Sequence, residues 1–581
     1  MNTIKTLMRS VKQYKRDSIL TPVYIIFEVA MEVTLPLLMS SLIDDGIDAG
    51  NMNYILKIGA ALVAAALISL VFGTLAGRTS ARASAGFARN LRQDMYYNIQ
   101  DFSFSNIDKF STSSLVTRLT TDVTNVQFSY MVIIRMAVRA PIMMFFSLGM
   151  SFSINRSLSL FFLAAVPVLG VGLFTIISKV HPRFERIFRT YDKLNNVVQE
   201  NLRGIRVVKS FVREEYEKEK FNNISEIIFQ DFTKAEKTIA FNMPLMQFSM
   251  YSCILFISWF GARMIVSDSM TTGQLTSFFT YALQILMSLM MLSMVFVMII
   301  ISRASAKRIA EVLQETSDLH NADNPVMNVP DGSVCFENVN FSYVGDKNKL
   351  CLTDINLDIK SGETVGIIGG TGSGKSSLVQ LIPRLYDITD GRLLVGGIPV
   401  GDIDLFSLRE SVAMILQKNV LFSGTIKENL LWGNSNASDE ELRRVCTLAR
   451  ADEFIRDFPD GYETHIEQGG TNLSGGQKQR LCIARTLLKK PKILIMDDST
   501  SAVDTKTDSQ IRKAFREEIP ETTKLIIAQR ISSVEDADKI VVMDNGKISA
   551  VGSHEELMSK STIYREVYES QVKGGRSDET R

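Results

Sequence analysis

The sequence predicts an all-helical membrane domain with six spans, followed by an α/β domain. Three observations support this: six long apolar stretches in the first half, alternating β-rich and helical runs in the second, and a polar linker between them. A membrane span needs about 20 apolar residues. Alternating strands and helices favour a largely parallel sheet. The first half of the chain is therefore expected to lie in a membrane, and the second half to form a separate α/β domain.

The whole-chain composition excludes several classes of protein. The 581 residues are 46% hydrophobic, and 64 basic against 63 acidic side chains leave a net charge of +1. A nucleic-acid binder would carry a strongly basic domain, and a disordered chain would combine low hydrophobicity with high net charge. Five dispersed cysteines indicate neither a disulfide framework nor a zinc site. We expect free thiols and no nucleic-acid partner.

The charges that flank the apolar stretches predict their orientation. We place the spans near 18–43, 54–77, 130–152, 157–179, 243–267 and 274–300. The short connections 44–53 and 268–273 lack Lys and Arg, whereas the long connections 78–129 and 180–242 are rich in both. By the positive-inside rule, the N-terminus and the long connections are cytoplasmic. We therefore expect a multi-pass protein of the cytoplasmic membrane with its second half in the cytoplasm.

The regions outside the spans have distinct compositions. The N-terminal arm is basic and lacks a signal-peptide cleavage site, so we expect it along the membrane surface. The long connections are patterned as helical extensions that offer contacts to a partner domain. A stretch rich in Pro, Asn and Asp indicates a linker. The predicted order is an arm at 1–17, a membrane domain at 18–315, a linker at 316–332, an α/β domain at 333–572 and a disordered tail at 573–581.

A glycine-rich motif of the form G-x-x-x-x-G-K-[ST] follows the expected strand ETVGII and precedes an expected helix. Its backbone N–H groups wrap nucleotide phosphates, its lysine (Lys375) reaches the β and γ oxygens, and its serine hydroxyl (Ser376) ligates Mg²⁺. The expected ATP-binding residues are Gly369, Gly370, Thr371, Gly372, Ser373, Gly374, Lys375, Ser376 and Ser377.

Two further motifs follow in order. An apolar run ends in Asp497, the arrangement of a Walker B acid that holds Mg²⁺. Before it, a Ser/Gly-rich segment opens an expected helix, whose free N–H groups and positive dipole end suit a phosphate. The residues of this segment are Leu473, Ser474, Gly475, Gly476 and Gln477.

With LSGGQ between its two nucleotide motifs, the chain resembles the ABC transporter family, of which LSGGQ is the signature. The resemblance covers essentially the whole chain and is that of an exporter half-transporter. It implies six transmembrane helices, one ATPase domain that uses ATP and Mg²⁺, and function as a dimer. It also implies an adenine-stacking Tyr343, a Mg²⁺-contacting Gln417, D-loop residues Ser501 and Asp504, and coupling regions at about 104–123 and 197–211.

Two positions depart from the family pattern. The family places a catalytic Glu directly after the Walker B Asp, but this chain has Asp498. The shorter carboxylate would fall about 1 Å short of the attacking water, which can cost on the order of 10²-fold in rate. The family places a switch His where this chain has Gln529. A glutamine can hydrogen-bond a phosphate but carries no positive charge. Both changes predict a degenerate, slow ATP site.

These departures and the intact signature predict a subunit that resembles those of the bacterial heterodimeric multidrug exporters. In ABC dimers each ATP lies between one chain's P-loop and the other's signature. A partner half-transporter with the consensus Glu and His would then hold the competent site, completed by Ser474, Gly476 and Gln477 of this chain. The alternatives are a slow homodimeric drug or lipid exporter, and a nucleotide-sensing regulatory or channel-like protein.

Polar and polarizable residues within the spans are candidates for the substrate path. Glu28 and Glu32 lie on one face of the first span. Buried charge in a membrane is costly, so they either attract cationic substrates or pair with a basic side chain. Methionine stripes suit a surface that accepts many shapes, although ordinary packing explains them too. These stripes are Met287, Met291, Met294 and Met298 in the sixth span, and Met243, Met246 and Met250 in the fifth.

Overall fold

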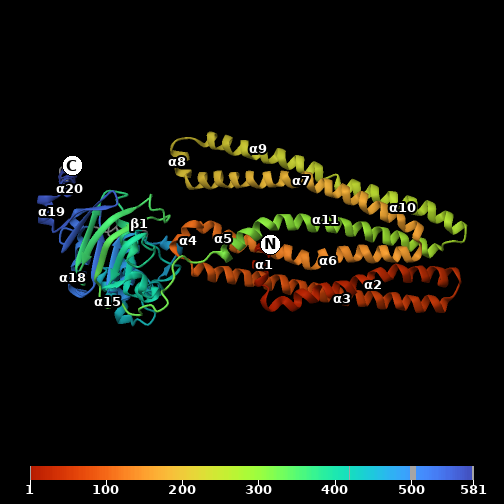
Figure 1. Ribbon diagram of the computed structural model, residues 1–581, viewed down its shortest axis with the longest axis horizontal. Helices are drawn as coiled ribbons and strands as arrows, with labels where there is room; N and C mark the ends of the chain where they lie inside the picture. Colours follow the sequence, from red (N-terminus) through yellow and green to blue (C-terminus); the bar gives the residue numbers. More distant parts are fainter. Residues whose placement is uncertain (1, 418, 498–504, 579–581) are drawn as a thin grey trace. The chain divides into compact units, whose positions relative to one another are not determined.

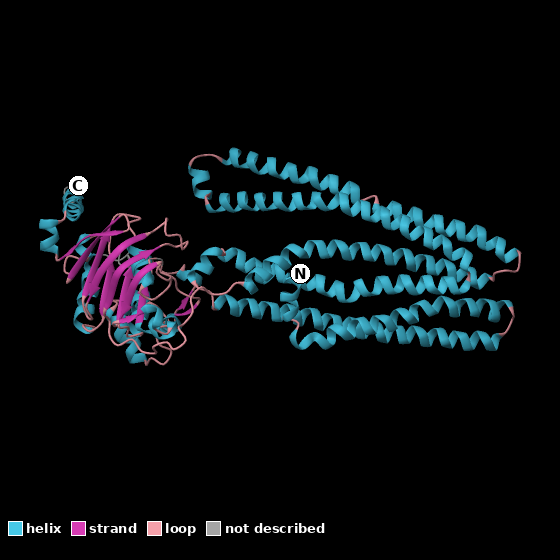
Figure 2. Cartoon of the chain, viewed as in Figure 1, coloured by secondary structure: helices cyan, strands magenta, loops and turns pink. Residues whose placement is uncertain are grey.

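The computed structural model describes residues 2–417, 419–497 and 505–578, and divides them into two compact units (Figures 1 and 2). The helical unit comprises residues 1–100 and 111–315. The α/β unit comprises residues 316–581 together with the short segment 101–110. The segment 101–110 therefore belongs to the α/β unit, although the chain on both sides of it belongs to the helical unit.

Long helices build the helical unit, and among the described residues six are long and apolar enough to cross a membrane. Each predicted span falls on one of them, which confirms the predicted class of membrane domain. The bounds are α1 Asn2–Arg9, η1 Lys12–Tyr14, α2 Lys15–Ser41, η2 Leu42–Asp48, α3 Met52–Gln100, α5 Thr112–Thr117, η3 Arg118–Asp122, α6 Val123–Ile154, α7 Arg156–Arg203, α8 Ile205–Ser210, α9 Glu214–Ile239, α10 Asn242–Val266 and α11 Thr272–Gln314.

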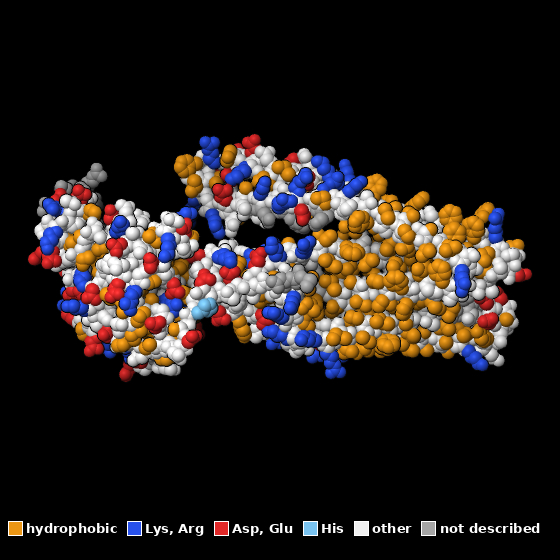
Figure 3. Space-filling model, viewed as in Figure 1, with side chains coloured by type: hydrophobic (Ala, Val, Ile, Leu, Met, Phe, Trp, Pro, Cys, Tyr) orange, Lys and Arg blue, Asp and Glu red, His pale blue; other side chains and the backbone are white. Residues whose placement is uncertain are grey.

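Several of these helices are longer than a bilayer is thick. The 49 residues of α3 span about 70 Å, whereas the hydrocarbon core of a bilayer measures about 30 Å. Figure 3 shows an apolar band over one part of the helical unit, with charged side chains on both sides of the band. Apolar residues within the predicted spans, such as Leu56, Phe174 and Phe248, are exposed, as lipid-facing side chains would be. The remaining length of the helices forms extensions outside the membrane.

The α/β unit contains two main sheets among its described residues. One has the order β12-β11-β3-β10-β9-β6, in which all neighbours are parallel except β12. The other, β2-β1-β4-β5, is antiparallel. The strands are β1 Val334–Phe341, β2 Leu352–Ile359, β3 Thr364–Gly369, β4 Asp390–Val395, β5 Ile398–Pro399, β6 Val412–Ile415, β7 Gly424–Thr425, β8 His465–Ile466, β9 Ile493–Asp497, β10 Thr523–Ile527, β11 Lys539–Asp544 and β12 Lys547–Gly552.

The antiparallel sheet was not anticipated from the sequence. In β2, buried and exposed residues alternate for much of the strand, whereas β9 is buried throughout. Alternation is typical of antiparallel strands with one face on the core, and continuous burial of strands within a parallel sheet. The sequence prediction of a largely parallel sheet therefore applies to the core sheet and not to β1, β2, β4 and β5.

Helices cover these sheets and complete the α/β unit. They are α4 Phe104–Lys109, α12 Lys375–Leu381, η4 Val400–Asp402, α13 Leu405–Ser411, α14 Ile426–Leu431, α15 Asp439–Leu448, α16 Asp452–Asp457, η5 Gly461–Glu463, η6 Gln468–Gly470, α17 Gly475–Leu488, α18 Thr505–Glu518, η7 Ile531–Ser533, α19 His554–Lys560 and α20 Thr562–Asp578. Helix α20 ends at Asp578 and so includes residues 573–578 of the segment 573–581 that the sequence predicts to be a tail; residues 579–581 lie outside the described residues.

Candidate nucleotide-binding site

The glycine-rich loop joins β3 to α12, as the sequence predicted for this motif. Gly374 caps α12 in the left-handed conformation, with φ of 93°. A Cβ at this position would also lie 2.7 Å from Cδ2 of Leu352, so only glycine fits. The Lys375 ammonium group folds over the loop and donates hydrogen bonds to the carbonyl oxygens of Gly369, at 2.9 Å, and Gly370, at 2.8 Å. The loop therefore presents a cation where phosphates are expected.

The Mg²⁺ ligands predicted on separate elements lie together. The Ser376 hydroxyl at the start of α12 donates a 3.1 Å hydrogen bond to Oδ1 of Asp497 at the end of β9. Asp497 is buried, and hard oxygen donors of this kind are the ligands that Mg²⁺ prefers. The two residues therefore fit a Mg²⁺ ion, which would neutralise phosphate charge when bound.

The order of the core strands brings four predicted positions to one edge of the sheet. Strand β10 lies between β3, which leads into the P-loop, and β9, which ends in Asp497. Gln529 follows the end of β10, and Gln417 follows the end of β6 on the other side of β9. Carboxyl ends of parallel strands meet at one edge, where ligands of open α/β sheets bind. Gln529 and Gln417 are both exposed at this edge.

The backbone at Gln529 is held by a helix that sequence reasoning did not connect to the site. The side-chain amide of Gln571 on α20 donates a 2.8 Å hydrogen bond to the Gln529 carbonyl oxygen. The side-chain Oε1 of Gln571 accepts a hydrogen bond from the Ile531 N–H at 2.9 Å. Helix α20 therefore contacts, through Gln571, the loop that carries Gln529, the residue expected at the switch position. No motif in the sequence marks Gln571, because a lone glutamine on a polar helix gives no signal.

The predicted adenine-stacking residue, Tyr343, leaves part of its ring accessible, with 46% of the residue exposed. Its hydroxyl lies 2.8 Å from the Ser377 hydroxyl on α12. Burial of part of the ring raises the pKa of Tyr343 above its ordinary value, so the phenol stays protonated at neutral pH. The structure thus joins Tyr343 to the helix that begins at the P-loop.

The signature residues lie at the start of α17, on a different element from the P-loop. Ser474 caps α17, accepting a hydrogen bond from the Gln477 N–H, while the Gln477 side chain accepts one from the Ser474 N–H. Leu473 is buried, and Gly475 and Gly476 form the first turn. Helix α17 packs against α14 and α15, whereas α12 packs against β3 and β10. Asp498, Ser501 and Asp504 lie outside the described residues.

In the first span, Glu28 and Glu32 both pair with Arg139 of α6. The Arg139 guanidinium donates to Glu28 through Nη1 and to Glu32 through Nη2, the latter at 2.7 Å from Oε2. Of the two explanations considered for these carboxylates, the structure shows pairing with a basic side chain. Arg139 was missed, although an arginine inside a predicted span, like Arg135 and Arg139 in the third, is itself a signal of a possible partner.

The methionine stripes face more than one environment. Met287 and Met294 of α11 are 61% and 57% exposed, while Met291 and Met298 are partly buried. On α10, Met243 is exposed, whereas Met246 and Met250 pack with Leu169 and Leu286. Part of the shorter stripe therefore serves helix packing.

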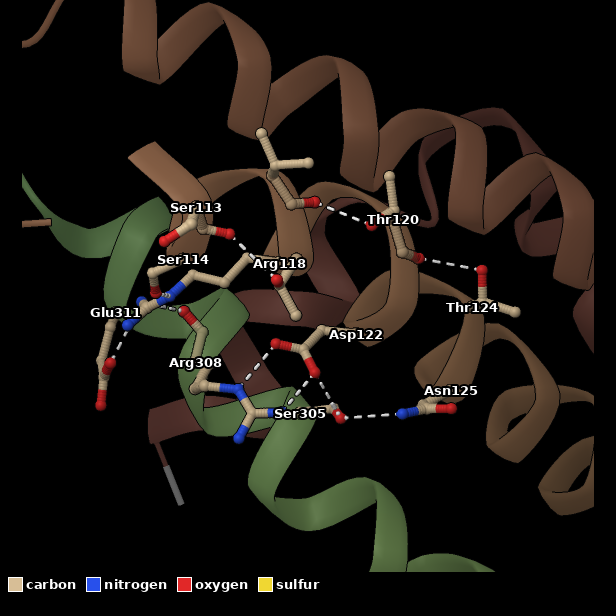
Figure 4. Close-up of polar contacts among 12 residues, drawn as sticks. Ser113, Ser114, Arg118, Thr120, Asp122, Thr124, Asn125, Ser305, Arg308 and Glu311 are labelled. Carbon is tan, nitrogen blue, oxygen red and sulfur yellow. Dashed lines mark hydrogen bonds and ion pairs between the residues drawn. The ribbon is translucent and has the colours of Figure 1, made fainter. Parts of the chain in front are cut away.

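A second polar cluster, also missed, joins η3 to α11 (Figure 4). We call Arg118, Asp122, Ser305, Arg308 and Glu311 the junction cluster. Asp122 is fully buried and accepts hydrogen bonds from Ser305 and Arg308. Arg118 donates to the Arg308 carbonyl oxygen at 2.7 Å and pairs with Glu311 at 3.1 Å. The sequence places η3 and α11 about two hundred residues apart, so no local pattern predicts these contacts.

A six-span helical domain followed by a P-loop ATPase domain with an LSGGQ signature defines an ABC transporter. Two family models match: the ABC transporter transmembrane region over residues 18–290 and the ABC transporter domain over residues 352–501. The chain is 36% identical over 544 residues to an uncharacterized ABC transporter ATP-binding protein, YfiB, of Bacillus subtilis, covering 94% of each chain. The chain belongs to the ABC transporter family.

Two further comparisons concern activity and fold. The chain is 32% identical over 499 residues to the ATP-dependent lipid A-core flippase of Desulfotalea psychrophila, covering 84% of this chain and 85% of the flippase. A solved structure of a bacterial Atm1-family ABC exporter with ATP bound superposes with a TM-score of 0.82 at 24% identity, covering 96% and 98% of the two chains. This likeness shows that the chain has the exporter fold. Members of the family couple ATP hydrolysis to transport and act as dimers in a membrane.

Proposed function

We propose that the chain is one subunit of a heterodimeric exporter that moves amphipathic small molecules out across the cytoplasmic membrane. Its own ATP site would be the slow one of the pair, and its signature would complete a competent site on the partner. The proposal rests above all on Gln529, which follows β10 between the P-loop strand and the Walker B strand. A neutral amide at this edge cannot supply the charge or the proton relay of a histidine.

The intact signature supports the second half of the proposal. Ser474 and Gln477 satisfy each other's backbone N–H groups, which holds the start of α17 in a defined shape. The N-terminus of α17 carries a positive dipole end that favours a phosphate. A chain that keeps this element while losing the catalytic Glu and the switch His is suited to complete a site whose P-loop lies on another chain.

The membrane helices and one relative support the proposed class of cargo. The flippase relative makes a lipid a second candidate cargo, alongside drug-like molecules. Exposed methionines on α11 suit an adaptable apolar surface. The Glu28, Glu32 and Arg139 triad carries two acids against one base, so this group of side chains has a local excess of one acid. That excess favours cationic over anionic amphiphiles.

The division of labour is tested in the complex purified with its natural partner. Asp498→Asn should leave most ATPase activity, within about twofold, because the partner's site does the work. Replacing the carboxylate that follows the partner's Walker B strand, or Ser474→Ala in this chain, should lower activity by at least about tenfold. Collapse of activity in Asp498→Asn would instead support a homodimer-like site on this chain. A partner carrying Asp and Gln at the same two positions would also contradict the proposal.

Transport is tested separately from hydrolysis. Inside-out vesicles that contain the complex should take up a cationic amphipathic dye or a fluorescent lipid when MgATP is added outside. Lys375→Ala together with the equivalent change in the partner provides the control without ATP binding. ATP hydrolysis without uptake of either probe would favour a nucleotide-sensing regulatory or channel-like protein.

A further inference from the structure

Helix α4 lies in segment 101–110, all of which belongs to the α/β unit. Ser103 caps it, and Asn106 returns the capping interaction to the Ser103 N–H. Ser105 donates a 2.7 Å hydrogen bond to Asp318, and Asn106 donates one to the Thr316 carbonyl oxygen at 3.1 Å. The chain enters this segment directly from α3 and leaves it directly into α5. Any displacement of α4 therefore reaches two helices of the helical unit through covalent connections.

Tyr386, which follows α12, connects α4 to the nucleotide site. Its hydroxyl donates a 2.7 Å hydrogen bond to Oδ2 of Asp108 on α4, and its ring lies 6.1 Å from that of Phe104. Burial and the bond to Asp108 raise the pKa of Tyr386, so its hydroxyl remains a donor at neutral pH. Hydrogen bonds to a charged acceptor are roughly twice as strong as neutral ones. The hydrogen bond between Tyr386 and Asp108 is therefore a strong contact with a defined geometry.

The ring of Tyr386 also packs against the ring of Tyr343. The two rings meet edge to face, with centroids 5.0 Å apart and an interplanar angle of 88°. Phe341 contacts both rings, at 4.7 Å from Tyr343 and 5.8 Å from Tyr386. Edge-to-face pairs hold a defined orientation because the positive edge of one ring meets the negative face of the other. The plane of Tyr343, the predicted adenine platform, is thus set partly by Tyr386.

We propose that Tyr386 is a positioning residue that links nucleotide occupancy at Tyr343 to the position of α4 through Asp108. An adenine stacked on Tyr343 restricts its ring plane, Tyr386 must follow at its edge, and the hydroxyl transmits the restriction to Asp108. The inference rests on the proposed ATP site. It adds the contact through which ATP bound at this chain's own site affects the position of α4. Coupling of this kind is reciprocal, so changes in α4 also alter nucleotide affinity.

The test measures amide hydrogen exchange of residues 103–109 in the full complex in lipid nanodiscs, with and without a non-hydrolysable ATP analogue and Mg²⁺. We expect the analogue to slow exchange of this segment by at least about fivefold, a factor at the lower end of typical allosteric couplings. Tyr386→Phe keeps the ring and removes only the bond to Asp108. It should reduce the slowing to less than about twofold while changing nucleotide affinity by less than about threefold.

The chain offers a matched control. Tyr462 donates a hydrogen bond to Asp452 at 2.9 Å elsewhere in the α/β unit. Tyr462→Phe therefore removes the same kind of bond and should leave the exchange response of residues 103–109 as in the unchanged protein. Tyr386→Ala also removes the ring that packs against Tyr343, so it should weaken binding of the ATP analogue by about fivefold or more.

The outcomes separate the inference from the proposed site. Full slowing in Tyr386→Phe, or equal loss in Tyr462→Phe, overturns the role of Tyr386. Unchanged affinity in Tyr343→Ala, measured by displacement of a fluorescent ATP derivative, overturns the adenine site and the inference with it. Normal analogue binding with no change of exchange at α4 in the unchanged protein overturns the inference alone.

Discussion

Nε of Arg308 on α11 lies 2.7 Å from Oδ2 of Asp122 on η3, and Asp122 is completely buried (Figure 4). The Ser305 hydroxyl donates to the other Asp122 oxygen at 2.8 Å. Helix α11 ends at Gln314, just before the chain passes into the α/β unit. The Asp122–Arg308 pair therefore holds η3 against α11, close to the point where the chain passes from the helical unit into the α/β unit.

The first prediction concerns this pair. Asp122→Asn should destabilise the protein by about 2 kcal/mol, because buried Asp122 accepts hydrogen bonds from Ser305 and Arg308 that a neutral amide satisfies less well, while the half-exposed Arg308 left behind keeps access to water. Glu311→Gln, whose side chain is 43% exposed, is the control and should cost less than about 1 kcal/mol. Thermal unfolding in detergent measures both. The double variant Asp122→Asn with Arg308→Gln should cost less than the sum of the single changes, and additive costs would contradict the pairing.

The second prediction concerns Arg139. Arg139→Gln leaves two carboxylates in the membrane without a partner, whereas Glu32→Gln leaves a balanced pair of Arg139 and Glu28. We expect Arg139→Gln to lower the unfolding temperature and the yield in the membrane far more than Glu32→Gln. Glu32→Gln should still weaken transport of cationic probes and spare neutral ones. Equal loss for both kinds of probe would remove Glu32 from substrate recognition.

The third prediction separates a helix cap from a catalytic contact. Ser438 caps α15 and Ser474 caps α17, each with a reciprocal capping box. Alanine at either position should cost about 1 kcal/mol of stability because a helix N–H loses its acceptor. Only Ser474→Ala should greatly lower ATPase activity of the complex. A similar loss in Ser438→Ala would show that capping alone explains the effect.

The fourth prediction concerns thiol reactivity in the α/β unit. Burial raises the pKa of Cys446 to about 12 and also raises the pKa of Cys482. The thiolate is the nucleophile, and a raised pKa leaves the protonated form dominant until the pH approaches that value. At neutral pH, N-ethylmaleimide should label the partly exposed Cys351 and leave Cys446 unlabelled until unfolding. Mass spectrometry of labelled peptides, with Cys351→Ser as a control, measures the difference.

The fold class could be predicted because its signals are local and strong. Apolar stretches of about 20 residues mark each span, because a helix of that length crosses the hydrocarbon core of a bilayer and satisfies all of its own backbone hydrogen bonds there. The motif around Lys375 also predicts its own setting, because only glycine tolerates the backbone at Gly374. The pairing of β1 with β2 and β4 was not predicted, because strand pairing depends on contacts between distant segments.

The candidate site was predicted in its parts but not in its arrangement. Ser376 and Asp497 were both assigned to Mg²⁺ from motifs, and the structure joins them by a hydrogen bond. Gln571 and Tyr386 carry no motif, so their contacts with Gln529 and Asp108 could not be inferred from neighbours in the sequence.

The sequence by itself determined the chemistry that each segment can perform: which stretches enter a membrane, which loop can hold phosphates, and that a glutamine stands at residue 529. The tertiary structure alone decided which groups meet. Arg139 offsets one of the two acids of the first span, β10 carries Gln529 to the edge between the P-loop and Asp497, and α4 is placed against Tyr386. The physical reason is that solvation and backbone conformation act on each segment locally, whereas charge compensation and ring packing require partners that only folding brings together.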